Sequence, residues 1–375
     1  MKIAGITWWR NNYGSILQAY ALQQYLRETE QVEYTIINQY SKKMASFDNL
    51  IDKLKTVGFV GTIKRLVFRF GLKKLRERVA SLQRFVDENL IVTEEIYNED
   101  NISITNSLFD GFICGSDQIW NPANTSLESM YWLCFADHTK LKIAYAPSIG
   151  ISRATEEQAA KIKQNLESFD AISSREEEGT NLINAIMGED KCKTVLDPTM
   201  LVERSIWDDI SQERIEDGKY IFVYILKGNK NERKMIEKFS KIVSLPIVTM
   251  PFLDGETIVP YDIKFGETKL WSVSPADFIS AIRGAEYIFT DSFHCMVFSC
   301  LYHKTFYTFP KKGALQMSRL IGLQKLLDTG DRMIHEEDLV EDLLNKTNID
   351  WERIDENLLL QRNRSRQYIH DALIS

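Results

Sequence analysis

The sequence predicts an α/β protein with two domains, each built on a parallel β-sheet. Short and nearly continuous apolar runs alternate with segments of helical periodicity, which is typical of strands covered by helices on both faces. This alternation is interrupted by the polar segment SQERIEDGK (211–219) and then resumes. A chain of 375 residues also suits two domains better than one.

The first half of the chain begins with a strand, a loop and a helix. The apolar run KIAGITWW (2–9) ends in the polar turn RNNYGS, and SILQAYALQQYLRE then has apolar residues three and four positions apart. This is the unit from which parallel sheets are built. Further strands are expected at 33–38, 109–115, 142–148, 169–176 and 193–201, the last with a proline break, and a helix is expected at 176–187.

A basic helical segment interrupts this pattern. Residues 46–92 have helical periodicity, and between Lys53 and Arg78 the only acidic residue is Glu77. A basic amphipathic segment such as 53–78 is suited to peripheral contact with an anionic membrane. The alternative, which we favour, is a helical insertion that packs its apolar side on its own domain.

The second half repeats the alternation of strands and helices. Strands are expected at 219–226, 246–250, 286–290 and 305–309, and helices at 275–285, 294–303 and 317–328. We therefore predict an N-terminal domain at 1–215, which carries the insertion at 46–92, and a C-terminal domain at 216–335. A polar helical tail follows at 336–375.

Composition excludes several classes of function. A net charge of −7 argues against nucleic acid as the main partner. The chain has no apolar run of about 18 residues and no signal-peptide pattern, so a cytoplasmic location is expected. The five cysteines are scattered without C-x-x-C spacing, and no group of His, Cys and carboxylate residues has the spacing of a metal site.

Polar residues at the expected strand ends are the candidates for a binding site. In parallel sheets ligands bind outside the carboxyl ends of the strands, and the cleft between two domains is the expected place. In the first domain these candidates are Asn12, Tyr13, Gly14, Ser15, Ser116, Asp117, Gln118, Asn121, Ser148 and Arg175. In the second domain they include Asp291, Ser292, His294, Lys311, Lys312 and Arg319.

Each of the main candidates also has a structural interpretation. His294 follows Thr-Asp-Ser at a strand-to-helix junction, where free backbone donors favour an anion, but a lone histidine is often a core residue. Arg175 precedes three glutamates and fits a surface ion pair. The NNYGS turn is neither a dinucleotide-binding fingerprint nor a Walker loop. Taken alone, spacing favours a functional role for His294 only slightly.

Six motifs taken together resemble the polysaccharide pyruvyl transferase family. They occur in the order of that family over about residues 3–327, and the ordered set is more specific than any one motif. They are NNYGSILQAYALQQYL, GSDQIWNP, YAPSIG, SSREEEG, VLDPTML and TDSFHCMVFSCLYHKTFYTF. The resemblance implies a GT-B-like fold with two Rossmann-like domains and a cleft between them.

The resemblance also implies a reaction. The family transfers the pyruvyl group of phosphoenolpyruvate to two hydroxyls of a sugar, which become bridged by a ketal. Phosphoenolpyruvate is then the donor substrate, and no metal or redox cofactor is required. The sugar acceptor belongs to a polysaccharide or a lipid-linked precursor, whose identity, linkage and ketal stereochemistry the sequence leaves open, as it does the oligomeric state.

Matching residues carry the implied roles. His294 and Asp117 are the expected catalytic acid and base, although the identity of the base stays open. The donor site implied by the resemblance comprises Arg175, Ser292, Phe293, His294, Lys311, Lys312 and Arg319. The acceptor site comprises Asn12, Tyr13, Gly14, Ser15, Ser116, Gln118, Asn121 and Ser148.

The chain departs from the family at one point of the donor site. Many members have Arg-Leu-His where this chain has Ser292-Phe293-His294, so an anion-binding arginine is missing. Lys312 or Arg319 is expected to supply that charge. Two other functions fit the same architecture: a glycosyltransferase that uses a sugar nucleotide, and a non-catalytic scaffold in polysaccharide assembly.

Overall fold

The computed structural model describes residues 1–39, 62–211, 214–226, 229–254, 257–258, 260–310, 314–335, 338–346 and 348–375. The chain divides into two compact units. The first unit comprises Met1–Ala45, Val86–Val202 and Leu358–Ser375, and the second comprises Ser46–Phe85 and Glu203–Asn357, so far as these ranges are described.

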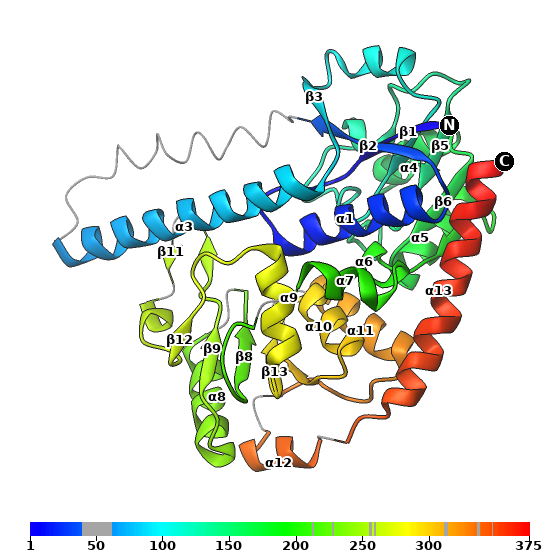
Figure 1. Cartoon of the computed structure of the whole chain (residues 1–375). Coiled ribbons are helices and arrows are strands. Elements are labelled where there is room, and N and C mark those ends of the chain that lie inside the picture. The colour runs from blue at the N-terminus through cyan, green and yellow to red at the C-terminus, as the bar shows by residue number, and fades with distance from the viewer. Residues whose placement is uncertain are drawn as a thin grey trace. The chain divides into compact units, whose positions relative to one another are not determined.

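A parallel sheet forms the centre of the first unit. In the described residues it has seven strands in the order β3-β2-β1-β4-β5-β6-β7, and every neighbouring pair is parallel (Figure 1). The strands are β1 (Lys2–Ile6), β2 (Glu33–Gln39), β3 (Val92–Tyr97), β4 (Gly111–Cys114), β5 (Leu141–Ala144), β6 (Ala171–Ser174) and β7 (Cys192–Thr194). Because all strands are parallel, their carboxyl ends lie at one edge of the sheet.

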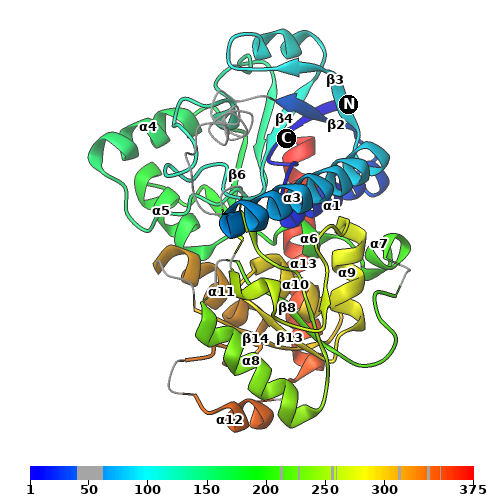
Figure 2. The same ribbon diagram turned by 90° about the vertical axis from the view of Figure 1, so that its left-hand side faces the viewer.

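Helices connect and cover these strands. Those of the first unit are α1 (Tyr13–Glu28), the 3-10 turns η1 (Ile102–Ser107) and η2 (Met130–Trp132), α4 (Glu156–Leu166), α5 (Glu177–Met187) and α6 (Pro198–Leu201). Helices α4 and α5 pack together, and α5 also packs on β6 and β7 (Figure 2). Helix α1 contacts both β2 and α6.

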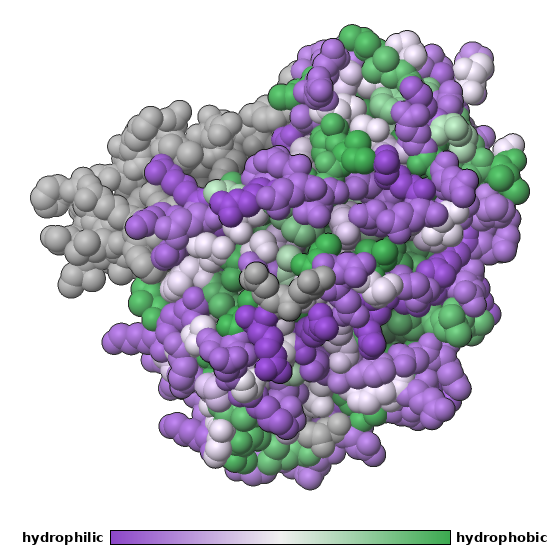
Figure 3. Space-filling view, in the orientation of Figure 1, coloured by the Kyte–Doolittle hydropathy of each residue, from purple (hydrophilic) through white to green (hydrophobic). Residues whose placement is uncertain are grey.

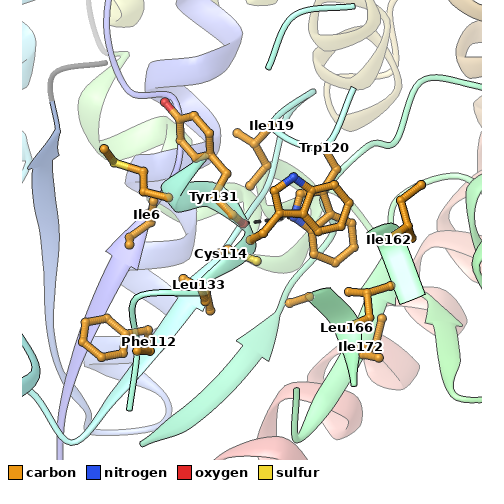
Figure 4. Packing of buried hydrophobic residues seen from close by; sticks show 14 of the residues in the cluster. Ile6, Phe112, Cys114, Ile119, Trp120, Tyr131, Leu133, Ile162, Leu166 and Ile172 are labelled. Atoms are coloured by element: carbon orange, nitrogen blue, oxygen red, sulfur yellow. Dashed lines mark hydrogen bonds between the residues drawn. The ribbon is translucent and has the colours of Figure 1, made fainter. Parts of the chain in front are cut away.

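The core of the first unit contains the tryptophan of the GSDQIWNP motif (Figure 4). The rings of Trp120 and Trp132 stack with centroids 4.7 Å apart, and the indole nitrogen of Trp120 donates to the carbonyl of Tyr131 at 3.0 Å. Ile119 and Trp120 are fully buried. Their burial fixes the loop after β4 to the core, because moving either side chain would open a large cavity.

The second unit has its own parallel sheet. Among the described residues its order is β12-β9-β8-β13-β14, with all neighbouring pairs parallel. The strands are β8 (Ile221–Tyr224), β9 (Ile247–Thr249), β12 (Thr268–Lys269), β13 (Tyr287–Thr290) and β14 (Thr305–Thr308), and a separate antiparallel pair is formed by β10 (Leu253–Asp254) and β11 (Thr257–Ile258).

The helices of the second unit follow the same pattern. They are α7 (Arg204–Ile210), α8 (Lys230–Val243), η3 (Pro260–Ile263), α9 (Pro275–Gly284), α10 (Phe293–Leu301), α11 (Ala314–Leu327) and α12 (Val340–Asn345). Two long helices, α3 (Thr62–Asn89) and α13 (Trp351–Ile374), each contribute residues to both units. Phe239 of α8 packs against Phe289 and Tyr307 of the sheet.

Most expected strands and helices occur, but helices α4, α7 and α8 and the short strands β10, β11 and β12 were not predicted, and two further differences have a clear cause. Residues 193–201 are not one strand: β7 ends at Thr194, and Pro198–Leu201 form helix α6. The reason is local, because Asp197 caps that helix and Pro198 takes its first position, which suits proline. Strand β3 was not predicted, since its sequence VTEEIY has no continuous apolar run.

The boundaries of the two compact units differ from those of the predicted domains. Glu203 already belongs to the second unit, before the predicted boundary at 215, and Leu358–Ser375 belong to the first unit. The described end of the predicted insertion, up to Phe85, groups with the second unit. There Arg78 is buried and donates to the carbonyls of Trp271 and Pro251, both at 2.9 Å.

No helix in the described ranges is both long and apolar enough to cross a membrane. On the face shown in Figure 3 hydrophilic residues predominate, and apolar ones form separate small groups. Part of the basic segment 53–78 lies outside the described residues, so its contact with membranes stays a prediction.

Candidate functional site

A cavity of about 880 Å³ opens in the first unit among loops that follow β1 and β4. Four of the predicted residues line it, namely Asn12, Ser15, Asp117 and Gln118. The others of the predicted acceptor set, Tyr13, Gly14, Ser116, Asn121 and Ser148, are buried and do not line it. About half of the residues predicted from the strand ends of the first unit for the acceptor and the base therefore line this cavity.

The start of helix α1 positions two of the lining residues. The side-chain oxygen of Asn12 accepts from the backbone N–H of Gly14 at 2.9 Å and of Ser15 at 3.4 Å, which is N-capping. The hydroxyl of Ser15, in the first turn, donates to Asp117 Oδ2 at 2.5 Å. The cap of α1 thus holds the hydroxyl that orients the Asp117 carboxylate.

The loop after β4 presents Asp117 through an unusual backbone. Gly115 has φ = 124°, and a Cβ there would lie 1.9 Å from the Tyr145 carbonyl oxygen, so only glycine fits. Asp117 itself is left-handed, with φ = 66°. Its conformation is held from both sides, because its Oδ1 accepts from Gln118 N at 2.8 Å and its carbonyl accepts from Ser148 N at 2.7 Å.

Arg175 lies in a buried cluster of carboxylates at the ends of β6 and β7. Its Nη1 is 2.8 Å from Asp197 Oδ2, and its Nε is 3.0 Å from Glu176 Oε1. The side chains of Arg175 and Asp197 are 2% and 0% exposed. Burial alone lowers the pKa of Arg175, but the carboxylates of Glu176, Asp197 and Asp117 outweigh burial and raise it above its ordinary value.

Three of the remaining predicted acceptor residues hold parts of the site in place: Ser116 and Ser148 bond to the carboxylates around Arg175, and Asn121 bonds to Gln118. The Ser116 hydroxyl lies 2.9 Å from the Ala146 carbonyl and 3.2 Å from Asp197 Oδ2. The Ser148 hydroxyl donates to Glu176 Oε1 at 2.5 Å. The Asn121 amide donates to Gln118 Oε1 at 2.8 Å. These side chains hold the residues of the site in place and do not face the cavity.

Several residues of the cavity wall were not predicted. They include Trp8, Trp9, Arg10 and Tyr131. The guanidinium carbon of Arg10 is 4.0 Å from the centre of the Trp9 ring, and Trp8 and Tyr131 meet edge to face at 6.5 Å. One feature of the sequence could have indicated these residues: Trp8, Trp9 and Arg10 place two aromatic rings and a cation directly after a strand, at the start of a polar loop.

In the second unit, three of the predicted donor residues, Ser292, Phe293 and His294, lie at the start of α10. Ser292 caps this helix by accepting from Cys295 N at 3.4 Å, and its own N–H donates to the Thr290 hydroxyl at 3.0 Å. His294 lies in the first turn, with its ring edge-on to Phe293 at 5.3 Å. Asp291 is engaged elsewhere, since its Oδ1 accepts from Leu226 N at 2.7 Å.

This arrangement places the imidazole of His294 at a helix N-terminus, where the helix dipole and backbone donors favour an anion. Arg319 lies on α11 of the same unit and is partly buried. Lys311 and Lys312 lie outside the described residues. Arg175, predicted for the same donor site, belongs to the first unit.

Comparisons with known proteins identify a family and a fold. A family model described as polysaccharide pyruvyl transferase matches residues 12–310. No curated protein matches the chain. Among solved structures, the chain is similar to the UDP-GlcNAc 2-epimerase from Methanocaldococcus jannaschii, with 12% identity, a TM-score of 0.51, and coverage of 96% of this chain and 100% of that chain.

A second similar structure is the UDP-N-acetylglucosamine 2-epimerase from Rickettsia bellii. It is 10% identical, with a TM-score of 0.52, and the match covers 98% of this chain and 96% of that chain. At such low identity these likenesses bear on the fold alone. Together with the two parallel sheets they confirm the predicted class, an α/β protein with two Rossmann-like units of GT-B-like fold.

Proposed function

The chain belongs to the polysaccharide pyruvyl transferase family, and on this premise we propose that it transfers the pyruvyl group of phosphoenolpyruvate to two hydroxyls of one sugar. The acceptor is a unit of a polysaccharide or of its lipid-linked precursor. The products are a cyclic pyruvate ketal and inorganic phosphate. The family match over residues 12–310 is the observation that carries this proposal.

The proposed reaction needs one acid and one base. A proton is added to the methylene carbon of phosphoenolpyruvate, which makes its C2 electrophilic, and the first sugar hydroxyl attacks C2 and loses its proton. The C2–O bond to phosphate then breaks, and the second hydroxyl attacks C2 and loses its proton in turn. One hydroxyl proton balances the new methyl group and the other leaves with phosphate, so no oxidant or reductant is consumed.

We assign acceptor chemistry to the first unit. Asp117 lines the cavity, and Ser15 and the Gln118 N–H donate to its two carboxylate oxygens. These donors fix the orientation of the carboxylate, which as a base would accept a hydroxyl proton. A cavity lined by aromatic rings, amides and hydroxyls also suits a sugar, which has both apolar faces and polar edges.

We assign donor chemistry to the second unit. His294 in the first turn of α10 would provide the proton, and the N-terminus of that helix would bind the phosphate or carboxylate of the donor. Ser292 replaces the arginine of many family members. Lys312 or Arg319 would then supply the missing positive charge.

The central test is phosphate release from phosphoenolpyruvate with a panel of galactosides, glucosides and N-acetylmannosaminides as acceptors. The wild-type protein should release phosphate with at least one of them, and His294→Ala should abolish release. His303→Ala is the matched control, because His303 in the same unit pairs with Asp355 at 2.9 Å and stacks on Trp351. Wild-type turnover by His294→Ala would show that the assignment of the acid is wrong.

The same assay separates the alternative functions. A glycosyltransferase would release a nucleotide from a sugar nucleotide and leave phosphoenolpyruvate intact, and a scaffold would turn over neither.

A double variant, Lys312→Ala with Arg319→Ala, tests whether these residues replace the arginine that is missing at Ser292. It should raise the KM for phosphoenolpyruvate. An unchanged KM would remove both residues from the donor site.

A further inference from the structure

One wall of the cavity in the first unit has no part in the chemical steps proposed above. It is formed by Trp8, Trp9 and Arg10 after β1, together with Ser129 and Tyr131. Arg10 is the only Lys, Arg or His among the described residues that line the cavity. A single cation placed among aromatic rings and hydroxyls requires a chemical explanation.

Arg10 is held in a fixed position. Its guanidinium lies over the Trp9 ring at 4.0 Å and donates to Asn38 Oδ1. Trp9 is itself locked, because its indole N–H bonds to Ile37 O at 3.2 Å and Gln39 Oε1 at 3.0 Å. A pre-ordered arginine loses little entropy when it binds a ligand.

Arg10 also keeps the capacity to bind an anion. Within the described part of the chain, no carboxylate forms an ion pair with it. Burial lowers the pKa of Arg10, because its charge has lost part of its water, and the nearby Tyr131 opposes that shift. A negatively charged ligand would restore the solvation that the guanidinium lacks.

Two hydroxyls complete the wall. Tyr131 and Ser129 are 2% and 8% exposed, and in the described structure neither hydroxyl makes a hydrogen bond of normal geometry, although the Gln39 and Trp8 side chains lie beside that of Tyr131. Burial raises the pKa of Tyr131 to about 12, although the side chains of Gln39 and Trp8 act in the opposite direction. The phenol is therefore protonated near neutral pH and can donate. Buried hydroxyls without partners are costly unless a ligand binds them.

We propose that Arg10, Tyr131 and Ser129 recognise a carboxylate or phosphate group on the saccharide acceptor, while Trp8 packs against the apolar face of the sugar that carries it. The inference rests on the proposed function for the ligand being the acceptor. The cavity, at about 880 Å³, is near the upper end of the usual range of about 300–1,000 Å³ for small-molecule sites. It has room for the charged unit beside the unit that receives the pyruvyl group.

The acidic residues of the cavity restrict where the anion binds. Among the described residues, three acidic ones line the cavity. Glu99 and Glu128 are exposed, so water and salt screen their charges. Asp117 is buried and its carboxylate accepts from Ser15 and from the Gln118 N–H, so an anion is disfavoured beside it. Arg10 is partly buried, and its charge is screened less. The charged group should therefore bind at Arg10 and not elsewhere in the cavity.

The test measures saccharide binding directly by ligand-observed NMR, without phosphoenolpyruvate. The probes are methyl glucoside as the neutral sugar, glucuronate as the carboxylate and glucose 6-phosphate as the phosphate. The wild-type protein should bind one of the charged probes at least about tenfold more tightly than the neutral one, which corresponds to about 1.4 kcal/mol. Which charged probe binds better identifies the source of the negative charge.

Variants assign the preference to this wall. Arg10→Gln should abolish the charge preference and retain neutral binding, and Tyr131→Phe should reduce it. Arg153→Gln, the same change at an exposed arginine of the first unit, should leave it intact. Equal binding of neutral and charged probes by the wild type, or a preserved preference in Arg10→Gln, would overturn the proposal.

The result is independent of the proposed reaction. A charge preference that depends on Arg10, without any phosphate release from phosphoenolpyruvate, would retain the binding site and reject the reaction. Release of phosphate with neutral acceptors alone would support the reaction and reject the anion-binding site at Arg10. A second readout is ionic strength, because salt should weaken only the charged probes.

Discussion

Arg175 is buried between carboxylates, and this position limits what it can bind. Its guanidinium contacts Asp197 at 2.8 Å and Glu176 at 3.0 Å, so phosphoenolpyruvate would have to compete with both for the same donors. Asp197 in turn lies within reach of the Ser116 hydroxyl, beside Asp117. The geometry therefore favours a positioning role, in which Arg175 neutralises the carboxylates that hold the loop after β4.

Replacing Arg175 with methionine should destabilise the protein strongly. The change leaves Asp197 and Glu176 buried without a counter-charge, which typically costs about 3–5 kcal/mol. Urea unfolding measures this loss, and Arg153→Met at an exposed position should change stability by less than about 0.5 kcal/mol. A stable Arg175→Met with a raised KM for phosphoenolpyruvate would instead support direct donor binding.

The destabilisation should also depend on pH. Without the arginine, the buried carboxylates of the folded variant should have raised pKa values, so the folded state binds more protons than the unfolded one. Stability then falls as pH rises. The deficit relative to wild type should accordingly be smaller at pH 5 than at pH 7.

At the residue scale, the sequence predicted some of the residues that line the cavity of the first unit, for a clear reason. Asn12, Ser15, Asp117 and Gln118 follow apolar strands, and the carboxyl ends of parallel strands meet at one edge. Trp9 was missed because the aromatic pair looked like the end of the strand, and Arg10 because it was assigned to the polar turn that follows. Tyr131 was missed because its position beside the cavity depends on the stacking of Trp120 on Trp132, a tertiary contact that no local pattern indicates.

At the scale of elements, the cap of α1 links helix stability to the cavity. Asn12 caps α1 and lines the cavity, whereas Asn229 caps α8 in the second unit. Asn12→Ala and Asn229→Ala should each lower the free energy of unfolding by about 1 kcal/mol, the usual cost of losing a cap. Only Asn12→Ala should also weaken saccharide binding, because Ser15 in the same turn orients Asp117.

Denaturation and ligand-observed NMR on the two variants separate these effects. Equal stability losses with binding lost only in Asn12→Ala would show that the cap positions the site. If Asn229→Ala weakened saccharide binding as much, the effect would reflect general destabilisation and the specific link would be rejected.

Secondary structure followed from sequence where the pattern was strong. The buried strands β4 and β13 are short apolar runs and were predicted, as was α9 with its capping box from Ser274 to Asp277. Strand β3 was not, because an edge strand with Glu94 and Glu95 facing solvent lacks the apolar pattern of a buried one. The single-turn helix α6 was missed because four residues carry no periodicity.

For the whole molecule, chain order and spatial units do not coincide. The first unit takes residues from three separate stretches, the last of them Leu358–Ser375. Side chains of α13 bond to backbone groups far away in sequence: Tyr368 to Ala144 O at 2.9 Å, and Ser365 to Leu196 N at 2.9 Å. A polar helical pattern does not indicate which groups such a helix contacts, so the sequence predicted only a helical tail able to fold back across both domains.

The end of α13 should therefore stabilise the region that holds Asp197. Arg362 is buried and its Nε donates to the Met200 carbonyl of α6 at 2.8 Å, while Arg364, two residues further along the helix, is exposed. Arg362→Ala should cost about 1.5–3 kcal/mol, the range for hydrogen bonds to charged groups. Arg364→Ala is the matched control and should cost less than about 0.5 kcal/mol.

Hydrogen exchange locates the effect of this change. In Arg362→Ala the amides of residues 195–202 should exchange faster, because α6 and its cap lose their support from α13, while amides of the second-unit strands β8 and β13 should keep their rates. Since Asp197 caps α6 and binds Arg175, the loss should extend to the loop that presents Asp117. Unchanged exchange at 195–202 would mean that α13 packs on this region without stabilising it.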